Sequence, residues 1–346
     1  MADKNNSFIA KTLRLFVKFG VAGVVIWLLF RGDSGRIVES LRRFDFLWLL
    51  PAVFFYALHM IVVAWRWRIL VEMTGIEMPF SAAVSLTLQG NFFSLVIPGG
   101  AIGGDVVKMA AISRRLGSGE RTGGAFSVLM DRIIGMIALF VLALILLFPA
   151  RPLFYGIRIA GLPEKLTGDV LFWLVFLLSL AGLAAGIAVF FYRQLEKIPG
   201  VTKLLAFCDR HGDGMASRIK ETIDVYRGNW KMLAKLTVVS IFGVHLMTVV
   251  PMFFLLAGNH AGVPILAVIA AVTIGNIAGL IPLFPGGIGG RDVTAVALML
   301  AGGVAKGTAD SAQLLYTAIM IVCFLAGGIF FIADPGRGIA AAGGGK

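Results

Sequence analysis

Apolar runs of about 20 residues recur along this chain and limit what it can fold into. A helix needs about 20 apolar residues, at 1.5 Å per residue, to cross the roughly 30 Å hydrocarbon core of a bilayer. Hydrophobic residues make up 58 % of the 346 residues and charged residues only 14 %, whereas soluble domains carry about 25 % charged residues. The pattern predicts an all-α polytopic membrane protein in which residues 1–346 form a single membrane domain.

Six runs are long enough to cross a bilayer completely. The expected crossings are Leu13–Phe30, Phe46–Ala64, Gly123–Pro149, Asp169–Tyr192, Lys231–Ala257 and Ser311–Ile332. The tryptophans and arginines of Trp65–Arg68 are expected to anchor the end of the second crossing at the membrane interface. The polar segment 193–230 is expected to be a helical hairpin on the cytoplasmic side.

Two further apolar segments are interrupted by glycine-rich breaks. Phe80–Ile97 ends in the sequence PGGAIGGD, and Val263–Phe284 ends in PGGIGGRD. The helix-like segments that follow, Val106–Leu116 and Val293–Leu300, are too short to cross the hydrocarbon core. A helix in, a glycine-rich break and a short helix out predict two re-entrant helical hairpins.

The two breaks repeat the same order of residues. Gly90-Asn91 precedes the first break and Gly275-Asn276 the second, and each break then runs Pro-Gly-Gly, a further glycine and Asp. This similarity predicts repeat-like units over about 80–150 and 263–333. Because three expected crossings separate the hairpins, they would enter from opposite faces, as in inverted-topology repeats.

Irregular backbone is tolerated at membrane depth where it is buried in protein or lines a wet cavity. A helix that begins after such a break presents unpaired N–H groups and a positive dipole end, which suit an anion such as phosphate. The expected head-group ligands are Arg132, Arg291, Asn91, Asn276, Gly99, Gly100, Gly286 and Gly287. The expected pathway or gating residues are Asp105, Asp131 and Asp292.

Several of these residues also have a purely structural interpretation. Asp131-Arg132 lies inside a crossing, where a central charge costs roughly 2.5–3.5 kcal/mol. The pair either makes ion pairs with a neighbouring helix, or Arg132 binds an anionic head group. Asp105 and Asp292 are alternatively N-caps of the outgoing helices. Asn91 and Asn276 are alternatively hydrogen-bonding groups between helices.

Other classes of site are not expected. The four histidines show no metal-ligand spacing, and His245 is expected to be a hydrogen-bonded packing residue. No nucleotide-binding loop is present, so we expect neither a metal nor another cofactor. The formal net charge of +12 is attributed to lysines and arginines in loops facing an anionic leaflet, and not to nucleic-acid binding.

The chain resembles the flippase-like membrane family, whose best-known member is the transmembrane region of lysylphosphatidylglycerol synthase, also called multiple peptide resistance factor. The matching motifs are Arg66–Leu70, Gly90-Asn91 with Pro98, Gly104–Lys108, Leu129–Ile134 and Pro285–Gly289. The resemblance implies a lipid-translocating domain. The aminoacyl-transferase domain of the full-length synthases is not carried over, since only Ala333–Lys346 follows the last expected crossing. Many relatives carry Glu where this chain has Asp292.

These features favour a transporter, and not an enzyme, that moves an anionic phospholipid or lipid-linked intermediate between leaflets of the bacterial inner membrane. The distribution of lysine and arginine favours cytoplasmic termini. One alternative is a membrane enzyme acting on a lipid phosphate or polyprenyl carrier, with Asp105, Asp131 and Asp292 as acid–base groups. Another is a non-transporting partner that binds a separate lipid-modifying enzyme through the basic segment Arg193–Lys235.

Overall fold

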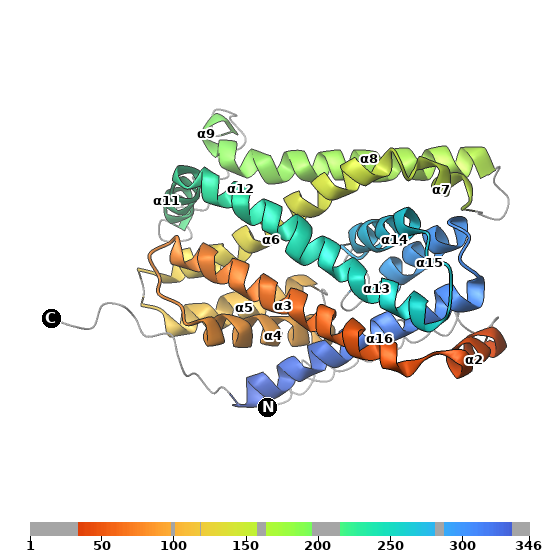
Figure 1. Ribbon diagram of the computed structural model, residues 1–346. Helices are drawn as coiled ribbons and strands as arrows, with labels where there is room; N and C mark the ends of the chain where they lie inside the picture. The colour runs from red at the N-terminus through yellow and green to blue at the C-terminus, as the bar shows by residue number, and fades with distance from the viewer. Residues whose placement is uncertain are drawn as a thin grey trace, which may run out of the picture.

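The computed structural model describes residues 34–97, 101–117, 119–157, 164–195, 215–280 and 287–333. Within these ranges every regular element is helical (Figure 1). The expected crossing Leu13–Phe30 lies outside the described residues. The first described element, α2 (Ser34–Arg43), packs against the last long helix, α16 (Lys306–Ala333).

Five continuous helical stretches in the described ranges are long and apolar enough to span a membrane. They are Phe46–Glu72, Arg121–Leu147, Thr167–Gln194, Trp230–Gly258 and Lys306–Ala333. Each has 27 to 29 residues, which exceeds the 20 or so that a crossing requires. They correspond to the second through sixth expected crossings, and they make the protein an all-helical, multi-pass membrane protein.

Some of these stretches contain short irregular elements. The first stretch consists of a 3₁₀ turn, η1 (Phe46–Trp48), and α3 (Leu49–Glu72), and the second stretch is the single helix α6 (Arg121–Leu147). The third consists of α8 (Glu164–Ala188), η2 (Val189–Phe191) and α9 (Tyr192–Leu195). The fourth consists of α12 (Trp230–Val239), the π-helix η3 (Ser240–Leu246) and α13 (Met247–Gly258). A π-helix inside a longer helix frequently marks a functional site.

The two interrupted apolar segments form antiparallel helical hairpins. The first hairpin is α4 (Phe80–Val96) with α5 (Ala101–Arg115), and the second is α14 (Ile265–Ala278) with α15 (Gly290–Ala301). The outgoing helices therefore begin closer to the breaks than the expected starts at Val106 and Val293. That each hairpin enters and leaves the membrane through the same face remains a prediction.

Glycines bring the helices of each hairpin together in the same register. A Cβ atom added at Gly104 would lie 2.1 Å from the Gly90 carbonyl oxygen, and one added at Gly275 would lie 3.0 Å from the Arg291 carbonyl oxygen. Gly104 and Arg291 occupy the same place in the two breaks, six residues after the proline. The repeat in the sequence is thus matched by a repeat in the packing.

The helices around the hairpins extend this similarity. The first hairpin contacts α16 and the second contacts α6, while α3 lies against α13. In Figure 1 the first hairpin lies below the diagonal formed by α12 and α13, and the second lies above it. The main apolar core fills the space where α3, α13, α14, α15 and α16 meet.

The polar segment 193–230 is described only in part, since residues 196–214 lie outside the described ranges. Its helix α11 (Met215–Gly228) is tied to the end of the third long stretch by Asp224. That carboxylate accepts hydrogen bonds from Arg193 at 2.7 Å and from the Tyr192 hydroxyl at 2.8 Å. The short helix α7 (Arg151–Tyr155) packs against α8.

Candidate functional site

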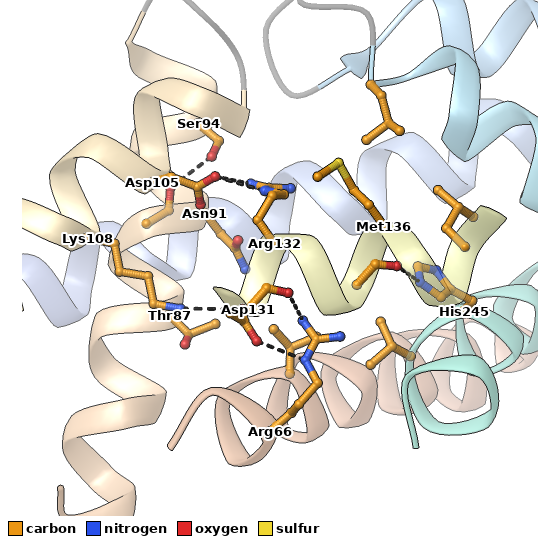
Figure 2. Close-up of a pocket in the computed structure, with 16 residues that line it drawn as sticks. Arg66, Thr87, Asn91, Ser94, Asp105, Lys108, Asp131, Arg132, Met136 and His245 are labelled. Atoms are coloured by element: carbon orange, nitrogen blue, oxygen red, sulfur yellow. Dashed lines mark hydrogen bonds and ion pairs between the residues drawn. The ribbon is translucent and has the colours of Figure 1, made fainter. Parts of the chain in front are cut away.

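A cavity of about 190 Å³ lies where the first hairpin meets α3, α6 and η3 (Figure 2). Its polar lining comes from α3 (Arg66), α4 (Thr87, Asn91 and Ser94), α5 (Asp105 and Lys108), α6 (Asp131 and Arg132) and η3 (His245). Leu280, just after α14, also contributes to the wall. Charged groups from three helices, α3, α5 and α6, therefore converge on one small space.

Helical spacing places the α4 contribution on one face. Thr87, Asn91 and Ser94 follow one another at intervals of four and three residues, which puts them in line along a helix. The Ser94 hydroxyl donates to the Gly90 carbonyl at 2.9 Å. Because Gly104 has no side chain, α5 approaches Gly90 and Ser94 closely enough for its polar residues to reach the same space.

Asp131 of α6 pairs with Arg66 of α3. The Arg66 Nε donates to Asp131 Oδ1 at 2.8 Å, and the same guanidinium donates to the Ser240 hydroxyl on η3 at 2.8 Å. Both charged side chains are buried, with exposed fractions of 5 % and 11 %. Arg66 therefore links three helices at the base of the cavity.

The neighbouring residue on α6, Arg132, has a different partner. Its Nε and a terminal nitrogen donate to Asp105 Oδ2 at 2.8 and 2.6 Å, and Figure 2 shows the two side chains pointing toward each other. The Arg132 side chain is 35 % exposed and that of Asp105 is 26 % exposed. This ion pair joins the hairpin to α6 at the more accessible part of the cavity.

Asp105 is therefore not an N-cap. Helix α5 begins at Ala101, so Asp105 lies one turn inside it. A carboxylate in that position points sideways from the helix, and here it reaches Arg132. The interpretation of Asp105 as a cap of the outgoing helix is wrong because the helix starts earlier than its sequence indicated.

Lys108 lies one turn after Asp105 and is almost completely buried. Its Nζ lies 3.6 Å from the centroid of the Trp67 ring, a cation–π arrangement, and 4.0 Å from Asp131 Oδ2. The second distance is longer than a hydrogen bond. Figure 2 shows Asp131 between Lys108 and Arg66, so one carboxylate serves two cations.

The expected interfacial anchor at Trp65–Arg68 is only half correct. Helix α3 continues to Glu72, so these four residues lie within it. Trp65 points outward, but Arg66 and Trp67 are buried, with exposed fractions of 4 % and 0 %. Adjacent helical residues point about 100° apart, so neighbouring residues of this segment have different surroundings.

The second hairpin has a charged cluster of its own. Arg291 is buried and donates to Asp292 Oδ1 and to the Thr317 hydroxyl, each at 2.9 Å. The Gln313 amide donates to the same Asp292 oxygen at 2.7 Å. The other Asp292 oxygen accepts the Gly289 N–H at 2.9 Å, so Asp292 caps the start of α15 from its third position.

The remaining residues that were predicted to bind the head group or to line its pathway either do not line the cavity or lie outside the described residues. Arg291, Asp292 and Asn276 are not among the described residues that line the cavity. Gly287 adopts a φ of +74°, and a Cβ atom there would lie 2.7 Å from the Gly279 carbonyl oxygen. The expected ligands Gly99, Gly100 and Gly286 lie outside the described residues.

Comparison with known families then assigns the chain. A family model, the lysylphosphatidylglycerol synthase transmembrane region, matches residues 15–328. The chain belongs to this family. The UPF0104 membrane protein PH1989 of Pyrococcus horikoshii is 24 % identical over 329 residues, which cover 92 % of this chain and 96 % of that protein.

The family motifs named above converge on the cavity. Each of the motifs Arg66–Leu70, Gly90-Asn91, Gly104–Lys108 and Leu129–Ile134 contributes lining residues. The described part of the last motif, Gly287–Gly289, lies instead directly before α15. The segments by which this chain resembles the synthase transmembrane region thus meet in space, although they are far apart in the sequence.

Sequence reasoning did not assign four polar residues to this cavity: Arg66, Thr87, Ser94 and Lys108. Arg66 entered as part of the expected interfacial anchor and of a family motif, and Lys108 only as part of a family motif. Thr87 and Ser94 were not considered. The available signal was the three-residue spacing of Asp105 and Lys108, which puts both on one face of a helix. His245 does make the expected packing hydrogen bond, since its Nε2–H donates to the Gly135 carbonyl at 2.9 Å, and it also lines the cavity.

Proposed function

We propose that this member of the synthase transmembrane-region family moves an anionic phospholipid or a lipid-linked intermediate between the leaflets of the bacterial inner membrane. One observation carries the proposal: three cationic side chains, Arg66, Lys108 and Arg132, face one cavity inside a membrane domain. Intramembrane ionisable residues are costly, and they commonly mark substrate pathways.

The cavity supplies what a head group loses when it leaves water. A phosphate entering the hydrocarbon region needs hydrogen-bond donors and positive charge in place of its hydration shell. Arg132 is the most exposed of the three cations whose ion pairs are described, and its planar fork suits phosphate oxygens. The hydrocarbon chains would stay in the surrounding lipid while the head group crosses.

The Asp105–Arg132 ion pair gives this pathway a gate. Asp105 lies on the hairpin and Arg132 on α6, so exchanging Asp105 for a phosphate would break this ion pair between the hairpin and that helix. Asp131 would keep Arg66 and Lys108 in place during the exchange. In the second hairpin, Arg291 and Asp292 would hold the equivalent contact with α16.

The proposed topology follows from helix lengths. At 17 and 14 residues, α4 and α14 are shorter than a full crossing requires. We therefore place both hairpins as re-entrant elements among six crossings, entering from opposite faces as inverted repeats, with both termini cytoplasmic. Asn276, Gly99, Gly100, Gly286 and Gly287 would line the path at the two turns.

Transport is favoured over chemistry at the lipid. The matched family is the transmembrane region of the synthase, and the carboxylates Asp105 and Asp131 are occupied in ion pairs with Arg132 and Arg66. A carboxylate neutralised by arginine is a poor general base. We propose that a separate lipid-modifying enzyme produces the lipid that this protein moves, and that transport requires no cofactor.

Reconstitution into liposomes tests this function. A fluorescent anionic phospholipid in the outer leaflet is quenched by an added reductant, and the protected fraction reports movement across the membrane. We expect the wild-type protein to move the lipid and Arg132→Ala to reduce the rate to that of protein-free vesicles. Arg151→Ala is the matched control, because it removes an arginine from a more exposed ion pair, with Asp169. Equal rates for wild type, both variants and empty vesicles would refute the proposal.

A further inference from the structure

Among the described residues, the charges that line the cavity do not cancel. Three cations, Arg66, Lys108 and Arg132, face two carboxylates, Asp105 and Asp131. With His245 counted as neutral, one positive charge is left over. A net charge in a largely buried space is unfavourable unless something compensates it.

The surplus belongs to Lys108. Arg132 has Asp105 at 2.6 Å and Arg66 has Asp131 at 2.8 Å. Lys108 shares Asp131 with Arg66, and its ammonium is 4.0 Å from that carboxylate. Contact with the Trp67 ring offsets part of the cost of burying this charge. The lysine nevertheless lacks a close anionic partner of its own.

A second, independent feature lies on the facing helix. The Thr87 hydroxyl is fully buried and has no hydrogen-bond partner among the described residues. A threonine inside a helix can usually bond to the carbonyl four residues before it. Thr87 and Lys108 both line the cavity. An unused donor and an under-neutralised cation therefore face the same space.

We propose that this cavity selects a head group with a single net negative charge, a phosphodiester, and that Lys108 and Thr87 hold its phosphate. One negative charge would neutralise the cavity. A terminal phosphate monoester carries close to two charges near neutral pH and would leave an excess of one. A zwitterionic head group would bring no net charge, and the surplus on Lys108 would remain. The inference rests on the proposed function and specifies its substrate class.

Lipid competition for the purified protein tests this selectivity. The detergent-solubilised chain is mixed at about pH 7 with equal amounts of phosphatidylglycerol, phosphatidic acid and phosphatidylethanolamine of identical acyl composition. Native mass spectrometry then counts the lipids retained on each protein. For wild type we expect phosphatidylglycerol to be retained about tenfold over the other two, a difference of about 1.4 kcal/mol.

Two variants change the charge count in opposite directions. Lys108→Met keeps most of the side-chain volume and brings the net charge of the cavity to zero, so the preference for phosphatidylglycerol over phosphatidylethanolamine should disappear. Asp105→Asn leaves the cavity with two surplus positive charges, so retention should shift toward phosphatidic acid. A variant that keeps the wild-type order of retention while remaining folded by thermal unfolding would overturn the proposal.

A pair of threonine variants tests the hydroxyl. Thr87→Val should reduce retention of phosphatidylglycerol several-fold. Thr273→Val is the matched control, because Thr273 on α14 is also buried with an unpartnered hydroxyl but does not line the cavity. Equal loss in both variants would overturn the role of Thr87.

The outcome is separable from that of the proposed function. Charge-matched retention without movement of lipid in vesicles would uphold the site and refute the transporter. Movement of all three lipids at equal rates, with no preference in binding, would uphold the transporter and refute the selectivity.

Discussion

The Arg66 guanidinium on α3 donates to the Asp131 carboxylate on α6 at 2.8 Å, and both side chains are buried. The two residues are 65 positions apart in the chain. The guanidinium also holds Ser240 of the π-helix, so a single side chain joins three membrane helices. Any rearrangement that opens the cavity has to keep or replace this contact.

Loss of either partner of this pair should be strongly destabilising. Removing one half of a buried ion pair leaves an uncompensated charge, which costs about 3–5 kcal/mol. We expect Arg66→Met and Asp131→Leu each to lower the thermal unfolding temperature in detergent markedly, and the double variant to cost less than the sum of the two. Arg68→Ala is the control on the same helix, since its pair with Glu72 is exposed and should be worth under about 1 kcal/mol. Additive losses in the double variant would contradict this account.

A methyl group at Gly104 should disrupt the first hairpin. The added Cβ atom would lie 2.1 Å from both the Gly90 carbonyl oxygen and the Ser94 hydroxyl, so α4 and α5 would have to separate. We expect Gly104→Ala to cost about 3 kcal/mol or more, in the range of overpacked cores, and to lower the yield of monodisperse protein in size-exclusion chromatography. Gly35→Ala, where nothing lies within 4 Å of the added atom, should match wild type. A Gly104→Ala protein with unchanged stability would show that the hairpin is looser than described.

The helix elements were predictable because their signal is local. The length of an apolar run decides whether it can cross a membrane, and five of the expected crossings appear with ends displaced by at most eight residues. The Pro-Gly-Gly breaks likewise located both hairpins. Helix starts were less predictable: α5 begins at Ala101, which moves Asp105 from a cap to an internal position.

The contents of the cavity were harder to predict. The pairs formed by Asp131 and Arg132 depend on which helices lie beside α6, and the spacing of residues along one helix carries no such information. Arg66 also stands between two tryptophans, a composition typical of the membrane interface. Arg66 is buried because α3 continues beyond the expected end of the crossing at Ala64. The missed residues are thus those whose roles come from contacts between distant segments.

The docking of α11 should depend on pH through Asp224. Hydrogen bonds from Arg193 and the Tyr192 hydroxyl lower the pKa of this exposed carboxyl below its usual value of 3.8. A lowered pKa in the folded state means that the contact stabilises α11 at neutral pH and is lost as the pH falls through the folded-state pKa. We expect the protection factors of the α11 amides, which are exchange rates corrected for the intrinsic effect of pH, to fall as the sample is acidified from about pH 5 to pH 3, within the range over which such a carboxylate titrates.

Asp224→Asn should show low protection factors in α11 at every pH, because its amide cannot carry the charge that holds Arg193. Glu221→Gln, on the same helix, is the control and should retain the wild-type pH dependence. If the protection factors of the Asp224 variant still rose with pH, another group would have to be responsible.

Blocking the cavity reversibly tests the central claim most directly. Asn91 lines the cavity and is partly accessible, so Asn91→Cys, in a protein whose Cys208 and Cys323 are replaced by Ser, can be modified with a bulky methanethiosulfonate reagent. Ile329→Cys, on an exposed apolar face of α16, is the control. With complete modification verified by mass, we predict that movement of a fluorescent anionic phospholipid between vesicle leaflets stops in the Asn91 variant and returns after reduction, and that the Ile329 variant is unaffected. Undiminished movement through a fully modified Asn91→Cys protein would contradict the account.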